Sequence, residues 1–129
     1  MERKTKRWIN LWQILICYLS LSACTSKDQI RYEQFVITGG QLYQQHCANC
    51  HGESGQGLRE LYPALTESKK LEDLNYLTCI IRKGGDKMPA NKELYDLDIA
   101  QISTFLKYRW AKDKTITETE DVSKIQCAN

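Results

Sequence analysis

The stretch that decides the fold is QLYQQHCANCHGESGQG, residues 41–57. Within it Tyr43, Cys47 and Cys50 follow one another at spacings of four and three, which predicts one face of a helix. Two cysteines separated by two residues, with His51 directly after the second, therefore share one helical turn. Three glycines follow, so we expect the chain after His51 to be mostly loop.

The Cys-x-x-Cys pair by itself fits half a zinc site, a redox pair or a structural disulfide. Zinc would need two further ligands, and His46 and His51 lie too close in sequence to complete the same tetrahedron. A thioredoxin-like pair belongs beside a βαβ pattern, and no such pattern is visible. Cys-x-x-Cys-His, in contrast, is the attachment signature of c-type haem. It predicts one covalent haem c on Cys47 and Cys50, with His51 coordinating the iron.

A second axial ligand is expected downstream, and Met88 is the only methionine after Met1. It stands in the polar stretch GGDKMPA, between two expected helices, where core packing is a poor explanation. Thioether sulfur suits haem iron, and Met/His ligation raises the potential. We therefore expect Met88 as the sixth ligand. Lys87 could replace it only if this loop rearranged.

Residues 1–23 are expected to be a signal peptide, with a basic start followed by an apolar run. The run ends in LSAC, which resembles the bacterial lipobox, so Cys24 is the predicted lipidation site. A plain signal peptide or an uncleaved anchor is the alternative. The remaining 106 residues carry 14 basic and 15 acidic groups, which excludes the basic patch that nucleic acid requires.

The rest of the chain has helical patterns and no clear hairpin signal, so the predicted class is all-α. We expect a tether over residues 24–38, which could include a short strand, then a domain over 39–112 and an extension over 113–129. One helix is expected along a leucine stripe from Leu71 to Ile81, and another over 96–110. A Thr117-x-x-Glu120 capping box predicts a further short helix. A domain this small usually needs a cross-link or a large apolar ligand to stabilise its fold.

From Gly39 to Trp110 the chain resembles a small class I cytochrome c. The resemblance rests on CANCHG, GQG, YPAL, RKGGDKMP and IAQISTFLKY. It implies three to five helices wrapped around one haem, with the first and last helices crossing near Gly39 and Phe105.

The resemblance also implies roles for single residues. The carbonyl of Pro63 would accept the Nδ1 proton of His51, and Tyr62 and Arg82, with Lys83, would be candidates to pair with the haem propionates. Small exported cytochromes that resemble this chain pair two cysteines at the places of Cys79 and Cys127.

A haem with two protein ligands has no open position for a small-molecule substrate, so we expect an electron carrier and no enzyme. Its partners would be redox proteins that dock transiently, while the lipid anchor holds it on a membrane outside the cytoplasm. Two alternatives remain open: a fixed electron-entry subunit of a larger oxidoreductase, and a haem sensor or enzyme from whose iron Met88 dissociates. A non-haem metallochaperone is more distant.

Overall fold

The computed structural model describes Gln13 and residues 26–128. The predicted signal peptide, apart from Gln13, and the predicted lipidation site Cys24 lie outside the described residues. The chain divides into two compact units, residues 1–30 and 31–129. Among the described residues, none of the helices has the length and hydropathy needed to cross a lipid bilayer.

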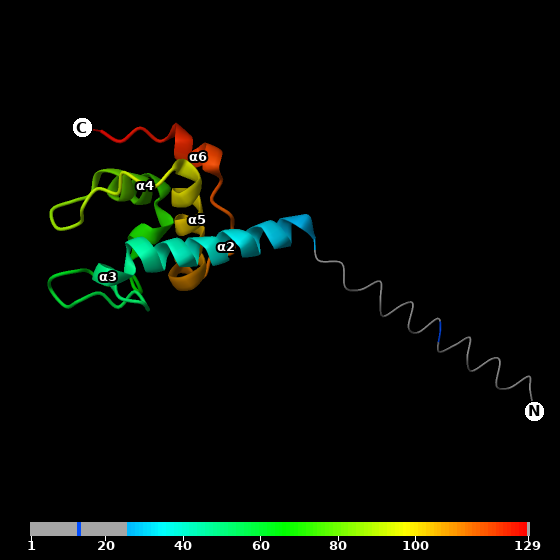
Figure 1. Ribbon diagram of the computed structural model, residues 1–129, viewed down its shortest axis with the longest axis horizontal. Coiled ribbons are helices and arrows are strands. Elements are labelled where there is room, and N and C mark those ends of the chain that lie inside the picture. Colours follow the sequence, from blue (N-terminus) through cyan, green and yellow to red (C-terminus); the bar gives the residue numbers. More distant parts are fainter. Residues whose placement is uncertain (1–12, 14–25, 129) are drawn as a thin grey trace, which may run out of the picture. The chain divides into compact units, whose positions relative to one another are not determined.

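The second unit is built from helices, and the expected all-α class is confirmed (Figure 1). Between residues 26 and 128 the only β pairing is an isolated bridge from Leu58 to Tyr62. The α-helices are α2 (Lys27–His46), α3 (Ala48–His51), α4 (Leu74–Lys83), α5 (Asp96–Leu106) and α6 (Thr119–Lys124), joined by the 3₁₀ turn η1 (Lys69–Glu72) and the π-helical turn η2 (Lys107–Ala111).

Helix α2 starts earlier than the sequence patterns suggest. The expected tether over 24–38, with its possible strand, is instead helical from Lys27 onward. Ser26 accepts a hydrogen bond on its Oγ from the N–H of Gln29 (3.1 Å), which satisfies a donor of the first turn. Phe35 is buried in the core, so packing also stabilises the helix well before Gly39, the expected domain start.

Two consecutive glycines lie inside α2, where they would ordinarily weaken a helix. A Cβ atom on Gly39 would overlap the carbonyl oxygen of Gln101 in α5. The backbones of α2 and α5 therefore approach as closely as glycine allows, and the expected helix crossing occurs here. Next to it, Phe105 packs against Tyr43 with ring centroids 5.5 Å apart.

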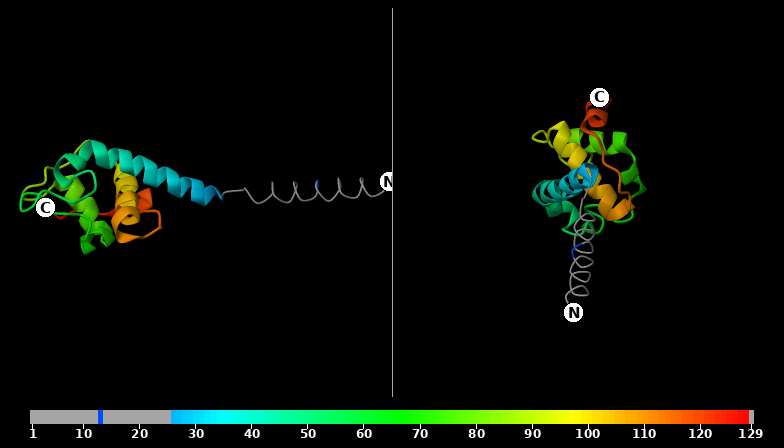
Figure 2. Two further views of the ribbon diagram at one scale, coloured as in Figure 1. Left: turned by 90° about the horizontal axis from the view of Figure 1, so that it is seen from below. Right: turned by 90° about the vertical axis from the view of Figure 1, so that its right-hand side faces the viewer.

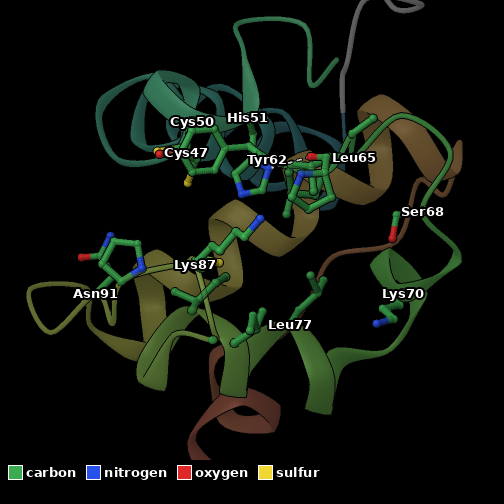
Figure 3. Close-up of a pocket in the computed structure, with 18 of the residues that line it drawn as sticks. Cys47, Cys50, His51, Tyr62, Leu65, Ser68, Lys70, Leu77, Lys87 and Asn91 are labelled. Atoms are coloured by element: carbon green, nitrogen blue, oxygen red, sulfur yellow. Dashed lines mark hydrogen bonds between the residues drawn. The ribbon is translucent and has the colours of Figure 1, made fainter. Parts of the chain in front are cut away.

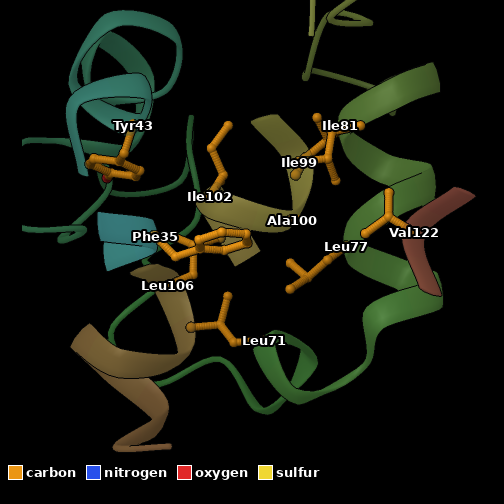
Figure 4. Packing of buried hydrophobic residues seen from close by; sticks show 10 residues of the cluster. All are labelled: Phe35, Tyr43, Leu71, Leu77, Ile81, Ile99, Ala100, Ile102, Leu106 and Val122. Atoms are coloured by element: carbon orange, nitrogen blue, oxygen red, sulfur yellow. The ribbon is translucent and has the colours of Figure 1, made fainter. Parts of the chain in front are cut away.

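The core lies where α2, α4 and α5 converge, and its members are aliphatic or aromatic (Figure 4). The expected continuous helix from Leu71 to Ile81 is interrupted at Asp73. Its carboxylate accepts the N–H of Tyr76 (3.0 Å), so Asp73 caps a new helix instead of continuing the old one. The buried cluster is Phe35, Tyr43, Leu71, Leu77, Ile81, Ile99, Ala100, Ile102, Leu106 and Val122.

The C-terminal extension packs onto the domain, with α6 against both α4 and α5 (Figure 2). Val122 is fully buried, and a disulfide joins Cys79 in α4 to Cys127. The predicted capping box is wrong: α6 starts at Thr119, and no side chain caps it. Thr117 is instead buried, and its N–H donates to Thr104 Oγ1 of α5 (2.9 Å). Tertiary contact therefore determines the start of this helix.

Candidate functional site

A cavity in the second unit has a volume of about 600 Å³, within the usual range of cofactor sites. Its wall includes the end of α2, helix α3, the loop around Tyr62 and Pro63, the inner face of α4 and the loop around Met88. Figure 3 shows Cys47, Cys50 and His51 on one side, with Leu77, Lys87 and Asn91 facing them. The cavity thus lies between the short helix α3 and the segment that follows α4.

One helical turn places the two thiols and the imidazole on the same wall. The N–H of His51 donates to the carbonyl of Cys47 (2.9 Å), and the N–H of Cys47 donates to the carbonyl of Tyr43 (2.9 Å). Both cysteines are half-buried free thiols, and both line the cavity with His51. This grouping is local in the sequence, because the three residues lie within one helical turn.

The orientation of His51 follows from one hydrogen bond. Its Nδ1 lies 3.0 Å from the carbonyl oxygen of Pro63, as the resemblance implies (Figure 3). Because a carbonyl can only accept, Nδ1 must carry the proton, which leaves the lone pair on Nε2. The N–H of Gly57 donates to the carbonyl of His51 (2.7 Å), and a Cβ on Gly57 would collide with Tyr62 and Pro63. Backbone packing thus fixes the acceptor of this hydrogen bond.

The loop after α4 brings Met88 to the same cavity. Gly84 ends α4 with a φ of 76°, a conformation that side chains disfavour. The N–H of Gly85 donates to the carbonyl of Met88 (2.8 Å), and the N–H of Asn91 donates to the carbonyl of Ile81 (2.9 Å). Met88 is half-buried against the core. These bonds make the loop an ordered part of the wall.

The donors that meet here fit a haem and do not fit a bare metal ion. Across residues 26–128 no cluster of three or more His, Cys, Asp or Glu side chains could hold a metal. One imidazole, one thioether and two thiols around a largely apolar space are what a c-type haem needs, since its macrocycle supplies the remaining iron ligands.

A family model described as Cytochrome C oxidase, cbb3-type, subunit III matches residues 35–106, more than half of the chain. The chain belongs to this family of c-type cytochromes. No curated protein matches the chain. A domain of this family binds haem c and transfers electrons, so the predicted cofactor and the electron-transfer class agree with the match.

One predicted contact of this cytochrome is wrong. Arg82 does not line the cavity, so it is not a propionate partner. Its guanidinium instead donates to Asp96 Oδ1 (2.6 Å) and to the carbonyls of Val122 (3.1 Å) and Ile125 (2.9 Å). Lys83 likewise donates to carbonyls near the C-terminus. Both side chains leave α4 on the face away from the cavity.

Other polar groups surround the cavity of the cytochrome. Tyr62 lines it as predicted, while Arg59 and Lys70 line it without having been predicted. Lys70 Nζ lies 4.7 Å from the ring centroid of Tyr76, another residue of the wall. A sequence signal for Lys70 and Tyr76 exists, because each directly precedes a leucine of the predicted stripe, Leu71 or Leu77. His46 is exposed and also lines the cavity.

Burial changes the acidity of two groups beside the cavity. It raises the pKa of the Cys47 thiol to about 11, and the adjacent Cys50 thiol adds to the rise. It also raises the pKa of Tyr43 to about 12, with Cys47 as a smaller cause. Tyr43 therefore remains a neutral donor, and its hydroxyl donates to the carbonyl of Gly52 (2.6 Å). That bond connects α2 to the chain immediately after His51.

Proposed function

We propose that this cytochrome is a monohaem class I carrier, lipid-anchored outside the cytoplasm, that passes single electrons between redox proteins. One haem would be attached covalently through Cys47 and Cys50, with His51 and Met88 as axial ligands. The observation that carries the proposal is that these four side chains all line one cavity.

Haem c, when bound, supplies a one-electron iron couple. The protein's part is to orient and enclose it. The hydrogen bond from His51 Nδ1 to Pro63 fixes the imidazole and keeps Nε2 free to coordinate. With Met88 as the other ligand, the protein would supply both of the iron ligands that the macrocycle does not. This arrangement favours electron transfer over chemistry on a small-molecule substrate.

The cellular setting in the proposal rests on the N-terminal sequence. A signal peptide over 1–23 and acylation of Cys24 would give stable anchoring, because several acyl chains on one residue bind far better than one. The domain would then lie in the periplasm or otherwise outside the cytoplasm, on the cell membrane or the outer membrane. Redox partners would dock there weakly, through small interfaces.

A second candidate is a fixed electron-entry subunit of a larger membrane oxidoreductase. It is favoured by the description of the matching family, which names an oxidase subunit. Extraction from the native membrane in mild detergent separates the two. Stable comigration with other redox subunits at high salt supports the fixed subunit, whereas release as a single cytochrome supports the carrier.

The ligand set is tested by optical spectra of the full chain matured with haem c, oxidised and reduced, with and without carbon monoxide. We expect the weak long-wavelength charge-transfer band of a methionine–iron bond in the oxidised form, and no response to carbon monoxide in the reduced form. Loss of this band in Met88→Ala would identify the ligand. A wild-type protein without the band that binds carbon monoxide would contradict the proposal and favour a sensor or enzyme.

A further inference from the structure

The C-terminal segment, residues 117–128, lies beyond the part of the chain that the family model matches. We call it the C-terminal strap. It is fastened to α4 by the disulfide from Cys79 to Cys127 and contributes Val122 to the core. The strap is therefore attached to the domain both by a covalent bond and by apolar packing.

Two basic side chains at the end of α4 hold the strap as well. Arg82 donates to the carbonyls of Val122 and Ile125, and its Nη2 also contacts Asp96 Oδ1 at the start of α5. Lys83 Nζ donates to the carbonyls of Cys127 (2.8 Å) and Ala128 (2.6 Å). The outer face of the last turn of α4 is thus fixed to the strap.

The same turn of α4 carries the Met88 loop. The carbonyl of Ile80 accepts the N–H of Gly84 (2.9 Å), and the carbonyl of Ile81 accepts the N–H of Asn91 (2.9 Å). Ile80 and Ile81 also line the cavity. The loop is therefore hydrogen-bonded to the two residues that immediately precede Arg82 and Lys83.

We propose that the C-terminal strap positions Met88, with Arg82 and the Cys79–Cys127 disulfide as its positioning groups. This inference rests on the proposed function, because it takes Met88 as an iron ligand. Release of a loop ligand requires local opening, and the free energy of that opening depends on the contacts that hold the loop. By immobilising the last turn of α4, the strap makes opening of the Met88 loop rarer.

The test uses the full chain with haem bound and a Cys79→Ser/Cys127→Ser variant. Cyanide binding to the oxidised form reports opening, because cyanide can enter only after Met88 leaves. We expect the saturating rate to rise about tenfold, part of what a disulfide closing a loop of this size contributes to stability. Hydrogen exchange at the amides of Gly85 and Asn91 should accelerate as well, a readout that does not depend on the haem.

Controls separate positioning from general destabilisation. Ile99→Val trims the core of α5 and leaves the Cys79–Cys127 disulfide and the Arg82 hydrogen bonds to the strap in place, so at a similar loss of thermal stability it should leave cyanide binding unchanged. Arg82→Lys keeps the disulfide and the charge but loses the planar fork that reaches two carbonyls, and it should also accelerate binding. It provides the test if the cysteine variant fails to fold.

The outcomes distinguish this inference from the proposed function. If wild-type protein shows the methionine–iron band but the strap variants bind cyanide and exchange amides at the wild-type rate, the strap does not position Met88. If Ile99→Val accelerates binding equally, the effect is general destabilisation, and the inference again fails. If wild-type protein lacks the band, the ligand assignment itself is wrong, and the inference falls with it.

Discussion

At the scale of single residues, the backbone around His51 is fixed by hydrogen bonds from several directions. The carbonyl of Gly52 accepts from the hydroxyl of Tyr43, and the carbonyl of His51 accepts from the N–H of Gly57. The imidazole itself donates to Pro63. Because three bonds from separate segments meet within two residues, the ring can hold one orientation before any iron is present.

Tyr43→Phe removes one of these bonds without changing the shape of the core. We expect a loss of about 1 kcal/mol in the free energy of unfolding, because the carbonyl of Gly52 loses its donor. Chemical denaturation of the haem-loaded protein measures it. The matched control is Tyr108→Phe, at an exposed ring, which should change little.

The same tyrosine should make stability depend on pH in the alkaline range. Burial raises the pKa of Tyr43 from 10.0 to about 12, so the folded state favours the neutral phenol. Its contribution is fully present below pH 10.0 and is lost as the pH rises through 12. Denaturation across this window should show a smaller decline in Tyr43→Phe than in the wild type. Equal declines would show that Tyr43 is not the group responsible.

At the scale of elements, α5 is the helix that the others share. It meets α2 at Gly39, carries Thr104 toward the C-terminal strap and contributes Ile102 and Leu106 to the cavity wall. Substitutions on its different faces should therefore differ in cost according to the atoms they meet.

Gly39→Ala places a methyl group on the carbonyl oxygen of Gln101. We expect a loss of about 1–3 kcal/mol, because two packed helices must separate to admit it. Gly40→Ala is the control, since its Cβ would lie 3.2 Å from an edge atom of the Phe105 ring, which can shift. Equal melting temperatures for the two variants would contradict the crossing described here.

Thr104→Val and Ser103→Ala compare two buried hydroxyls on neighbouring positions of α5. Thr104 Oγ1 accepts the N–H of Thr117, so its loss should cost about 1–3 kcal/mol by leaving a buried donor unsatisfied. Ser103 Oγ is buried with no partner among the described residues, so its removal should be neutral or stabilising. Urea denaturation of both variants should give this order, and the reverse order would contradict the hydrogen-bond assignment.

At the scale of the whole molecule, a small core lies beside a large cavity. Among the described residues, ten buried hydrophobic side chains form the cluster, and the cavity beside it occupies about 600 Å³. Preparing the chain without haem should therefore remove much of the cooperativity of thermal unfolding, even with the disulfide intact. Calorimetry and near-ultraviolet circular dichroism of the two forms measure this. A haem-free chain that unfolds as sharply as the loaded one would show that the helices suffice.

The site residues that the sequence predicts and those that it does not differ in how far along the chain their interaction partners lie. Cys47, Cys50 and His51 form one local pattern, and Met88 stands out as the only downstream methionine. Arg82 was misassigned because its carbonyl partners lie 40 and 43 positions away in a segment that local patterns leave unplaced.

The start of α2 was partly readable from sequence. Ser26 and Gln29 stand at the spacing of a helix N-terminus, a signal that the expected tether over 24–38 does not take into account. Only the close approach to Gln101 explains why a helix continues through its two consecutive glycines. Such an approach depends on Gly39 and Gln101, which lie 62 positions apart, so no local pattern contains it.

The disulfide has a consequence for maturation. Four cysteines lie among the described residues, and in an oxidising compartment any two could form the wrong bond. Cys79 leaves α4 outside the cavity and is bonded to Cys127, whereas Cys47 and Cys50 face the cavity as free thiols. Folding thus separates the thiols by position, so that the pair left free is the pair beside the histidine. A chain that lost Cys127 alone would expose an unpaired Cys79 as a competitor for them.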